Sequence, residues 1–218
     1  MAPVLIITGG IGSGKSTVVR LLLEMYPRAA AYCADQRAKE LYLSREGLLE
    51  AIEEALGTCL RPEGHFVPAL MASRIFGDEK AVEAVEKLLF PAIKEDFAAF
   101  AGSGTACGAP FIIFESATVL EKEAFEGFGD KVFLVDAPLE TRLARACMRD
   151  GASREEVLAR MEKQRLMNAF SQGTLTKFAD GSALQRAASR VDEVIHNDST
   201  EDVLRERLAA AVSRSMNL

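Results

Sequence analysis

The chain of 218 residues contains no tryptophan, two histidines and four cysteines. The cysteines show no C-x-x-C spacing, which argues against a zinc site or a redox pair. The two histidines have no partner spacing typical of metal ligands. Reduced thiols in a cytoplasmic protein are therefore the preferred interpretation. The cysteines are Cys33, Cys59, Cys107 and Cys147.

Long apolar runs and an excess of positive charge are also missing. No stretch approaches the roughly 20 apolar residues that a membrane span needs. The apolar start of the chain runs into a glycine-rich loop, so it does not resemble a signal peptide. The net charge of -6 argues against broad nucleic-acid binding, for which a basic footprint is expected. We expect a cytoplasmic protein that has neither a membrane nor a nucleic acid as its partner.

The most informative feature that is present is the glycine-rich stretch 9–16. It fits G-x-x-x-x-G-K-[ST], with an apolar run before it and a helical pattern after it, as this motif requires. Such glycines allow backbone N–H groups to point at phosphates, and the N-terminus of the following helix favours an anion. Lys15 can reach the terminal phosphates, and the Ser16 hydroxyl can bind Mg²⁺. The alternative is a glycine-rich turn that binds nothing, but the eight matching positions favour a nucleoside triphosphate. The residues predicted to bind it are Gly10, Ile11, Gly12, Ser13, Gly14, Lys15, Ser16 and Thr17.

Five short apolar runs predict buried parallel strands that alternate with helical patterns. This alternation is typical of a three-layer, doubly wound α/β fold with a five-stranded parallel sheet. The first helix should cover 15–25 and end before Pro27, because a residue that precedes proline resists the helical conformation. The five runs cover residues 3–8, 29–34, 111–115, 131–136 and 191–196.

Two long helical segments interrupt this pattern. One covers about 36–108, and the other covers about 140–189 and is rich in arginine. The remaining core, at about 1–35, 109–139 and 190–218, would make the chain a single domain. Insertions at the carboxyl ends of parallel strands are expected to carry ligand-binding parts in open α/β folds. The sequence therefore predicts two helical insertions near the phosphate loop.

Two absences indicate the class of nucleotide-binding protein. There is no Asn-Lys-x-Asp stretch of the kind that reads guanine, and the third apolar run ends in Glu115, without the aspartate of a usual Walker B strand. Both absences favour a kinase for small molecules. Glu115 could hold a metal-bound water or a substrate hydroxyl, or it could merely end the strand.

Asp35 follows the second predicted strand directly and should lie at the edge of the sheet that carries the phosphate loop. A carboxylate there could accept a proton from an attacking hydroxyl and help to organise Mg²⁺. Aspartate is also a favoured N-cap, so the side chain could simply begin the next helix. Position alone does not decide between these two interpretations.

The arginines of the second insertion could form a lid over the triphosphate. Arg142, Arg145 and Arg149 are spaced i, i+3 and i+7, which places them on one face of a helix. They could neutralise charge in the transition state, or they could form a solvated face paired with neighbouring carboxylates. We expect a functional role for Arg149 and Arg145 first.

Several separated motifs resemble the dephospho-coenzyme A kinase family. The phosphate loop 8–17 is similar to that of the family, although many kinases share such a loop. The ordered combination of motifs is more specific and covers most of the chain. It comprises Cys33-Ala34-Asp35, Ser73-Arg74-Ile75-Phe76, Leu89-Phe90-Pro91, Val135-Asp136-Ala137-Pro138-Leu139-Glu140, Arg149-Asp150 and Val194-Ile195-His196-Asn197.

This resemblance implies a P-loop kinase that uses ATP and Mg²⁺ to phosphorylate the ribose 3′-hydroxyl of dephospho-coenzyme A. The segment 36–108 would be the substrate-binding insertion and 140–189 the lid, in a monomer or a small homo-oligomer. Ser16 and Asp35 would bind the metal ion, and Glu115 and Arg74 would make weaker contacts with the substrate. The implied catalytic residues are Lys15, Asp35 and Arg149, with Arg145 and Asn197 beside the ATP.

The chain departs from the family pattern at several positions. Cys33 replaces the first aspartate of its motif, Phe90 replaces a histidine, and an arginine is missing near Ala69. The stretch 168–190 is also longer than the corresponding stretch typical of the family. Two rival functions therefore remain open. One is a kinase for a nucleoside monophosphate or another small acceptor, and the other is a nucleotide-binding regulator without catalysis.

Overall fold

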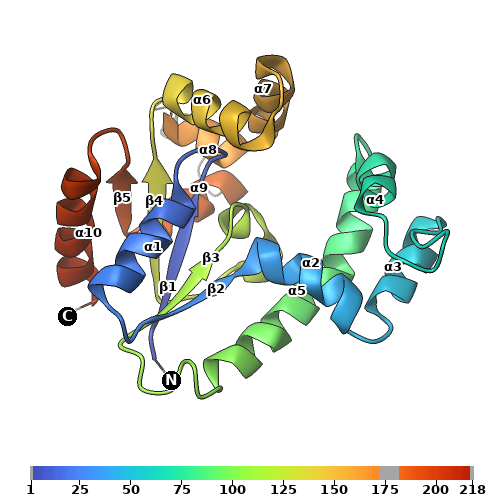
Figure 1. The fold of residues 1–218 in the computed structure, drawn as a ribbon, viewed down its shortest axis with the longest axis horizontal. Coiled ribbons are helices and arrows are strands. Elements are labelled where there is room, and N and C mark those ends of the chain that lie inside the picture. The colour runs from blue at the N-terminus through green and yellow to red at the C-terminus, as the bar shows by residue number, and fades with distance from the viewer. Residues whose placement is uncertain (1, 172–181, 217–218) are drawn as a thin grey trace. The chain divides into compact units, whose positions relative to one another are not determined.

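The structure is a computed structural model, and it describes residues 2–171 and 182–216. The chain consists of two compact units. The first unit consists of residues 1–33 and 104–218 and contains the β-sheet. The second unit, Ala34–Ser103, is helical. Figure 1 shows the elements of both units.

Within the described residues, the strands of the first unit form one five-stranded sheet in the order β2-β3-β1-β4-β5, and every pair in it is parallel. The predicted doubly wound α/β fold is thereby confirmed. The last strand begins later than predicted, because the carboxylate of Asp192 binds the N–H of Val132 (2.8 Å) ahead of the regular ladder. The strands are β1 (Val4–Gly9), β2 (Ala30–Cys33), β3 (Ile112–Glu115), β4 (Lys131–Asp136) and β5 (Glu193–His196).

Helix α1 (Lys15–Met25) has the predicted bounds. It ends where the N–H of Tyr26 closes on the carbonyl of Leu22 (2.8 Å), one residue before Pro27. The other helices of this unit are α6 (Leu139–Asp150), α7 (Arg154–Glu162), α8 (Arg165–Ser171), α9 (Ala183–Ser189) and α10 (Glu201–Met216), with 3₁₀ turns η1 (Val119–Glu121) and η2 (Glu123–Phe125).

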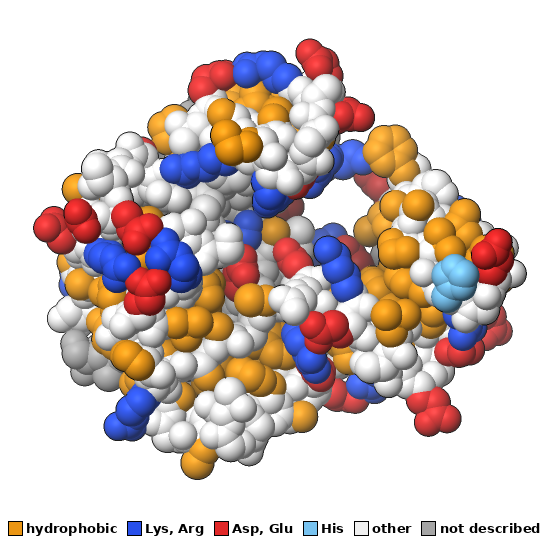
Figure 2. Space-filling model, in the orientation of Figure 1, with side chains coloured by type: hydrophobic (Ala, Val, Ile, Leu, Met, Phe, Trp, Pro, Cys, Tyr) orange, Lys and Arg blue, Asp and Glu red, His pale blue; other side chains and the backbone are white. Residues whose placement is uncertain are grey.

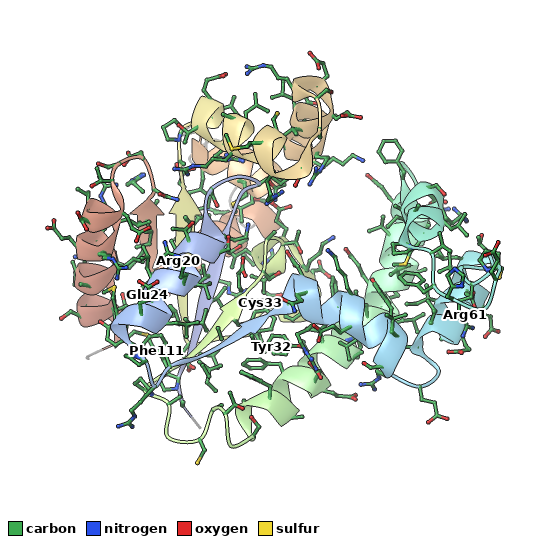
Figure 3. The ribbon with its side chains drawn as sticks, viewed as in Figure 1. Arg20, Glu24, Tyr32, Cys33, Arg61 and Phe111 are labelled. Atoms are coloured by element: carbon green, nitrogen blue, oxygen red, sulfur yellow. The ribbon has the colours of Figure 1, made fainter. Side chains whose placement is uncertain are left out.

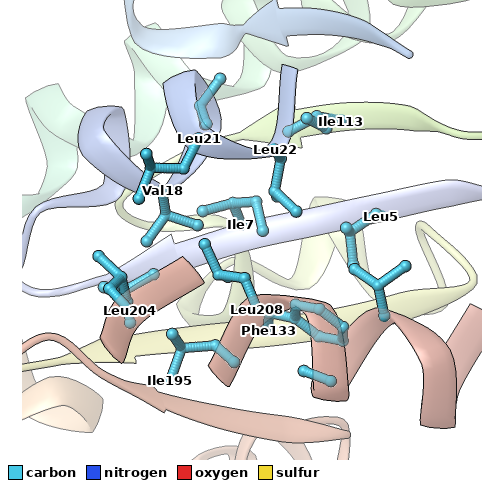
Figure 4. Packing of buried hydrophobic residues seen from close by; sticks show 14 of the residues in the cluster. Leu5, Ile7, Val18, Leu21, Leu22, Ile113, Phe133, Ile195, Leu204 and Leu208 are labelled. Carbon is cyan, nitrogen blue, oxygen red and sulfur yellow. The ribbon is translucent and has the colours of Figure 1, made fainter. Parts of the chain in front are cut away.

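Apolar side chains pack against both faces of the sheet that contains β1. On one face, Leu5 and Ile7 pack against side chains of α1 and α10, as Figure 4 shows for Val18, Leu22 and Leu208. On the other face, the ring of Phe114 contacts those of Phe128 and Phe125, with ring centroids 4.8 Å and 5.9 Å apart. Each fully buried leucine or isoleucine contributes about 1.5–3 kcal/mol. The strand that leads into the phosphate loop is therefore firmly anchored.

Charged side chains of both signs intermix over α1 and α10 (Figure 2). Arg20 of α1 pairs with Glu201 of α10 at 2.5 Å, and Arg205 of α10 pairs with Glu24 of α1. These side chains are one third to one half exposed, so each pair adds little to stability. This face is a solvated surface of helix–helix ion pairs.

The helical unit is built from α2 (Ala34–Ser44), α3 (Leu48–Leu56), α4 (Pro68–Ile75) and α5 (Glu79–Ala101). Leu49 and Ile52 of α3 and Val85 and Leu89 of α5 are buried, in agreement with the helical spacing of apolar residues in this segment. Arg37 of α2 donates to both carboxylate oxygens of Asp96 on α5, at 2.9 Å and 2.6 Å. Among the described residues of either unit, no helix is both long and apolar enough to cross a membrane.

Candidate active site

The loop between β1 and α1 has the backbone shape that its glycines permit. Gly12 and Gly14 lie in the left-handed region, with φ of +75° and +94°, a conformation that costs other residues about 1–2 kcal/mol. The N–H of Ser13 donates to the carbonyl of Gly10 (3.1 Å) and closes a tight turn. Helix α1 then begins at Lys15 with no side chain capping its N-terminus. Its first N–H groups are therefore suited to an anionic ligand.

Other parts of the sheet unit press closely against this loop. A Cβ at Gly12 would overlap the carbonyl oxygen of Arg142, and a Cβ at Gly14 would overlap the side-chain amide of Asn197. The loop is thus in contact with α6 on one side and with the segment after β5 on the other. Glycine is required at both positions by the backbone conformation and by the lack of space.

Replacing Gly12 by alanine should weaken ATP binding at least about tenfold. The added methyl group meets a backbone carbonyl, and relieving about 1–3 kcal/mol of overpacking requires the loop to move. Calorimetric titration with ATP measures this effect. Gly127→Ala is the matched control, because Gly127 has nearly the same φ (+72°) but open space around its Cβ position. The control should lose about 1–2 kcal/mol of stability and keep its ATP affinity. Equal ATP affinity in the two variants would contradict the steric explanation.

Lys15 lies over the loop that it follows. Its Nζ donates to the carbonyls of Gly9 (3.0 Å) and Gly10 (3.5 Å). Ser16 and Thr17 occupy the same first turn of α1. The ammonium group of Lys15 and the N-terminus of α1 therefore lie at the same loop, which suits a phosphate group.

Ile11, at the tip of the loop, is held from three sides. Its N–H donates to Oε1 of Gln164 (2.8 Å), and its carbonyl accepts a hydrogen bond from Nε of Arg142 (3.1 Å). Its side chain packs against an apolar cluster of α6 and α7 that includes Leu143 and Val157. The tip of the loop is thereby attached to the helices that follow β4.

Arg142 is almost completely buried, with 1 % of its surface exposed. Burial lowers the pKa of its guanidinium, and the nearby carboxylate of Asp136 opposes that shift. An arginine remains protonated even so. A positive charge shielded from water therefore lies directly against the phosphate loop.

Asn197 and Arg145 are also brought to the loop. Nδ2 of Asn197 donates to the carbonyl of Ser13 (2.8 Å), and its backbone N–H donates to the carbonyl of Asp136 (2.7 Å). Arg145 in turn donates to the carbonyl of Asn197 (3.3 Å). These two predicted residues therefore lie together beside Gly14, and their role next to ATP stays a prediction.

Arg149 makes different contacts from its two neighbours on the same helix. Its side chain is 61 % exposed and donates to both carboxylate oxygens of Asp150, at 2.6 Å and 3.0 Å. Arg160 of α7 donates to the same carboxylate (2.7 Å). Hydrogen bonds from Arg149 and Arg160 hold the pKa of Asp150 well below its usual range. The role of Arg149 at the phosphates stays a prediction.

Glu115 lies at the carboxyl edge of the sheet, in register with Ile7 of β1 and Cys33 of β2. Together with Ser16 and residues of α1, Glu115 and Cys33 line an open groove of about 430 Å³. Figure 3 shows Cys33 at the end of β2 and Arg20 and Glu24 on α1. This groove places a carboxylate and a thiol beside the serine of the phosphate loop.

Asp35 and Arg74 belong to the helical unit. Asp35 is in the first turn of α2, two residues after β2 ends. Arg74 is near the end of α4, where it donates to the carbonyl of Leu56 (3.2 Å) and pairs with Asp78 (2.8 Å). Their predicted roles toward metal and substrate stay predictions.

Gln164 and the particular position of Arg142 are the features that sequence analysis missed. Arg142 shares a helical face with Arg145 and Arg149, so the pattern groups it with them and does not distinguish a buried arginine from two more accessible ones. Gln164 lies in the turn between α7 and α8, where no motif marks it. Gln164 is 153 residues from Ile11 in the sequence, so only the folded structure shows that the two residues are in contact.

Known proteins resemble this chain over most of its length. Residues 4–201 match the family model described as "Dephospho-CoA kinase". A dephospho-CoA kinase from Porphyromonas gingivalis is 35% identical over 158 residues, which are 72% of this chain and 75% of that protein. One from Burkholderia lata is 29% identical over 210 residues, 95% of this chain and 93% of that protein.

Solved structures share the architecture. A crystal structure of a Thermus thermophilus protein superposes with a TM-score of 0.75 at 27% identity, over 98% of this chain and 97% of that one. A dephospho-CoA kinase from Campylobacter jejuni has a TM-score of 0.61 at 19% identity, over 100% of this chain and 99% of that one. At that identity the second likeness shows the fold alone.

Proposed function

Since the chain belongs to the dephospho-CoA kinase family, we propose that its phosphate loop holds the ATP from which a phosphoryl group passes to dephospho-CoA. The reaction of the family is the last step of coenzyme A biosynthesis, in which the 3′-hydroxyl of the ribose takes the γ-phosphate of ATP. The observation that carries this assignment is the family match over 4–201 together with the loop between β1 and α1.

The described residues fit ATP at this loop. Gly12 and Gly14 leave no room for a side chain, and α1 begins without a side-chain cap. Lys15 would contact the β- and γ-phosphates, and the loop residues 10–17 would surround them with N–H groups. Arg145 would contact ATP from α6, and Asn197 would lie near the adenine.

The hydroxyl of Ser16 is a suitable ligand for Mg²⁺, because the serine at this position of such a loop binds the metal ion that accompanies the phosphates. Among the described residues there is no cluster of three or more histidine, cysteine, aspartate or glutamate side chains that could hold a metal ion on their own. The ion would therefore depend on the phosphates, with Ser16 and Asp35 as protein ligands. When bound, Mg²⁺ neutralises charge on the phosphate oxygens.

On the acceptor side, Asp35 would accept the proton of the 3′-hydroxyl. The hydroxyl oxygen would then form a bond to the γ-phosphorus, while the bond between the γ-phosphorus and the oxygen of the departing ADP breaks. Lys15 and Arg149 would stabilise the negative charge of the transferring group. Glu115 and Arg74 would contribute weaker contacts to dephospho-CoA. The helical segment 36–108 would bind the rest of this substrate, and the segment 140–189 would act as a lid around the reacting phosphates.

We also propose that the enzyme works in the cytoplasm as a monomer or a small homo-oligomer, without a nucleic-acid partner. The net charge of -6 supports the last point.

A coupled assay with ATP, Mg²⁺ and dephospho-CoA tests the proposed function, with the product identified by mass. We expect ADP and coenzyme A in equal amounts. A panel of nucleoside monophosphates and shikimate serves as the control for the acceptor. Faster turnover with one of these would assign a different small-molecule kinase, and ATP binding without turnover of any acceptor would assign a regulator.

A further inference from the structure

We infer that Gln164 and Arg142 are positioning residues that hold the two peptide groups on either side of Ile11, and that they thereby set the affinity of the enzyme for ATP. The inference rests on the proposed role of the loop in binding ATP. It adds two residues that act through Ile11.

Gln164 orients the peptide between Gly10 and Ile11. In a trans peptide, N–H and C=O point in opposite directions within one plane. The N–H of Ile11 binds Gln164 on one side, and the carbonyl of Gly10 accepts from the N–H of Ser13 (3.1 Å) and Nζ of Lys15 (3.5 Å) on the other. Both ends of this peptide are therefore held, and the carbonyl contacted by Lys15 has a defined direction.

Arg142 orients the next peptide by the same reasoning. Its Nε holds the carbonyl of Ile11 at 3.1 Å, so the N–H of Gly12 must point away from Arg142. The backbone of Arg142 also closes the space behind Gly12. The direction of one N–H group of the phosphate loop thus depends on a buried arginine of α6.

The turn that carries Gln164 is itself well supported. The N–H of Gln164 donates to the carbonyl of Met161 (2.9 Å), and the N–H of Asn168 donates to the carbonyl of Gln164 (3.0 Å). Nδ2 of Asn168 binds the carbonyl of Met161 as well (3.0 Å). With 8 % of its surface exposed, Gln164 has few alternative positions for its amide.

Holding these peptides matters because a loop rich in glycine has many alternative conformations. If only part of the population has the phosphate-binding conformation, the apparent affinity for ATP falls by that fraction. At saturating ATP the bound phosphates hold the loop instead. Loss of the Gln164 contact should therefore raise the KM for ATP much more than it lowers kcat.

The test is Gln164→Met, which keeps the length of the side chain and its neutral charge but removes the acceptor. We expect ATP to bind about tenfold more weakly by calorimetry, with kcat within about threefold of the wild type. Glu206→Gln is the control, because Glu206 is an exposed residue of α10, outside the lid and the substrate-binding insertion. It should leave both constants unchanged.

Hydrogen exchange followed by NMR separates positioning from a general loss of stability. In Gln164→Met the amide of Ile11 should exchange at least about tenfold faster, whereas the amide of Val18, which donates to Gly14 within α1, should not change. Gln164→Glu retains an acceptor oxygen and should restore the slow exchange of Ile11. Should Gln164→Met fail to fold, Arg142→Gln provides the second variant, with the same selective rise in the KM for ATP.

Unchanged ATP affinity in Gln164→Met, or equal acceleration of exchange at Ile11 and Val18, would overturn the inference. Failure of the proposed function has a different signature, because the wild-type enzyme would then form no coenzyme A from dephospho-CoA, whatever the effect of Gln164→Met on ATP binding and on the exchange of Ile11. The two failures are therefore distinguishable.

Discussion

Replacing Asp35 by asparagine is expected to lower kcat with dephospho-CoA by about 10³-fold and to leave the Kd for ATP within about threefold of the wild type. Asparagine has nearly the same size but cannot accept the proton of the 3′-hydroxyl, and general-base catalysis contributes about 10²–10⁴-fold. Steady-state kinetics and calorimetry with ATP measure the two quantities. The asymmetry between them identifies a residue that acts mainly on the acceptor, and whose proposed contact with Mg²⁺ adds little to the affinity for ATP.

Asp202→Asn is the matched control for this experiment. Asp202 is exposed and lies in the first turn of α10, just as Asp35 lies in the first turn of α2. A carboxylate at either position stabilises its helix through the dipole by about 0.3–1 kcal/mol. If Asp35→Asn behaves like Asp202→Asn, with only a small change of stability and normal kcat, then Asp35 serves its helix and another group accepts the proton.

Lys15→Met should reduce kcat by about 10²–10³-fold, which is the usual effect of removing one preorganised group from a developing negative charge. In the structure, Nζ of Lys15 is within 3.0 Å of the carbonyl of Gly9, so the variant also removes a contact within the loop. We therefore expect weaker ATP binding in addition to the loss of turnover. Rapid-quench measurement of the chemical step distinguishes the two effects.

Lys87→Met on α5 is the control, because that lysine has a highly exposed side chain (72 %). It should have normal kcat and normal ATP affinity. Retention of more than about one third of the wild-type kcat by Lys15→Met would exclude a role for this ammonium group in stabilising the transferring phosphoryl group.

A feature of this molecule can be predicted from the sequence when the residues that form it lie close together in the chain. Helix α1 and the loop before it are local features, since the glycines, Lys15 and Pro27 lie within one short stretch, and their bounds are as predicted. The strands are also readable, because buried strands of a parallel sheet are continuous apolar runs. The strand order needs the structure, since apolar runs do not say which neighbours pair.

The candidate site is predictable at the loop and only partly beyond it. The sequence predicts Arg145 and Asn197 near the nucleotide; in the structure they contact one another beside Gly14, and their role at the nucleotide stays a prediction. The sequence does not predict the buried position of Arg142, because three arginines on one helical face look alike in it. Gln164 has no sequence signal, since a glutamine in a turn acquires its role only from the backbone N–H that tertiary folding brings to it.

The order of the strands has a consequence for how the enzyme folds. Between β1 and both of its partners, β3 and β4, the sequence carries the whole helical unit. The carbonyl of Ser13 accepts its hydrogen bond from Asn197, 184 residues further on. Such non-local pairing is slow to form. The phosphate loop is therefore one short stretch of sequence, but its final shape forms only after distant segments of the chain have come together.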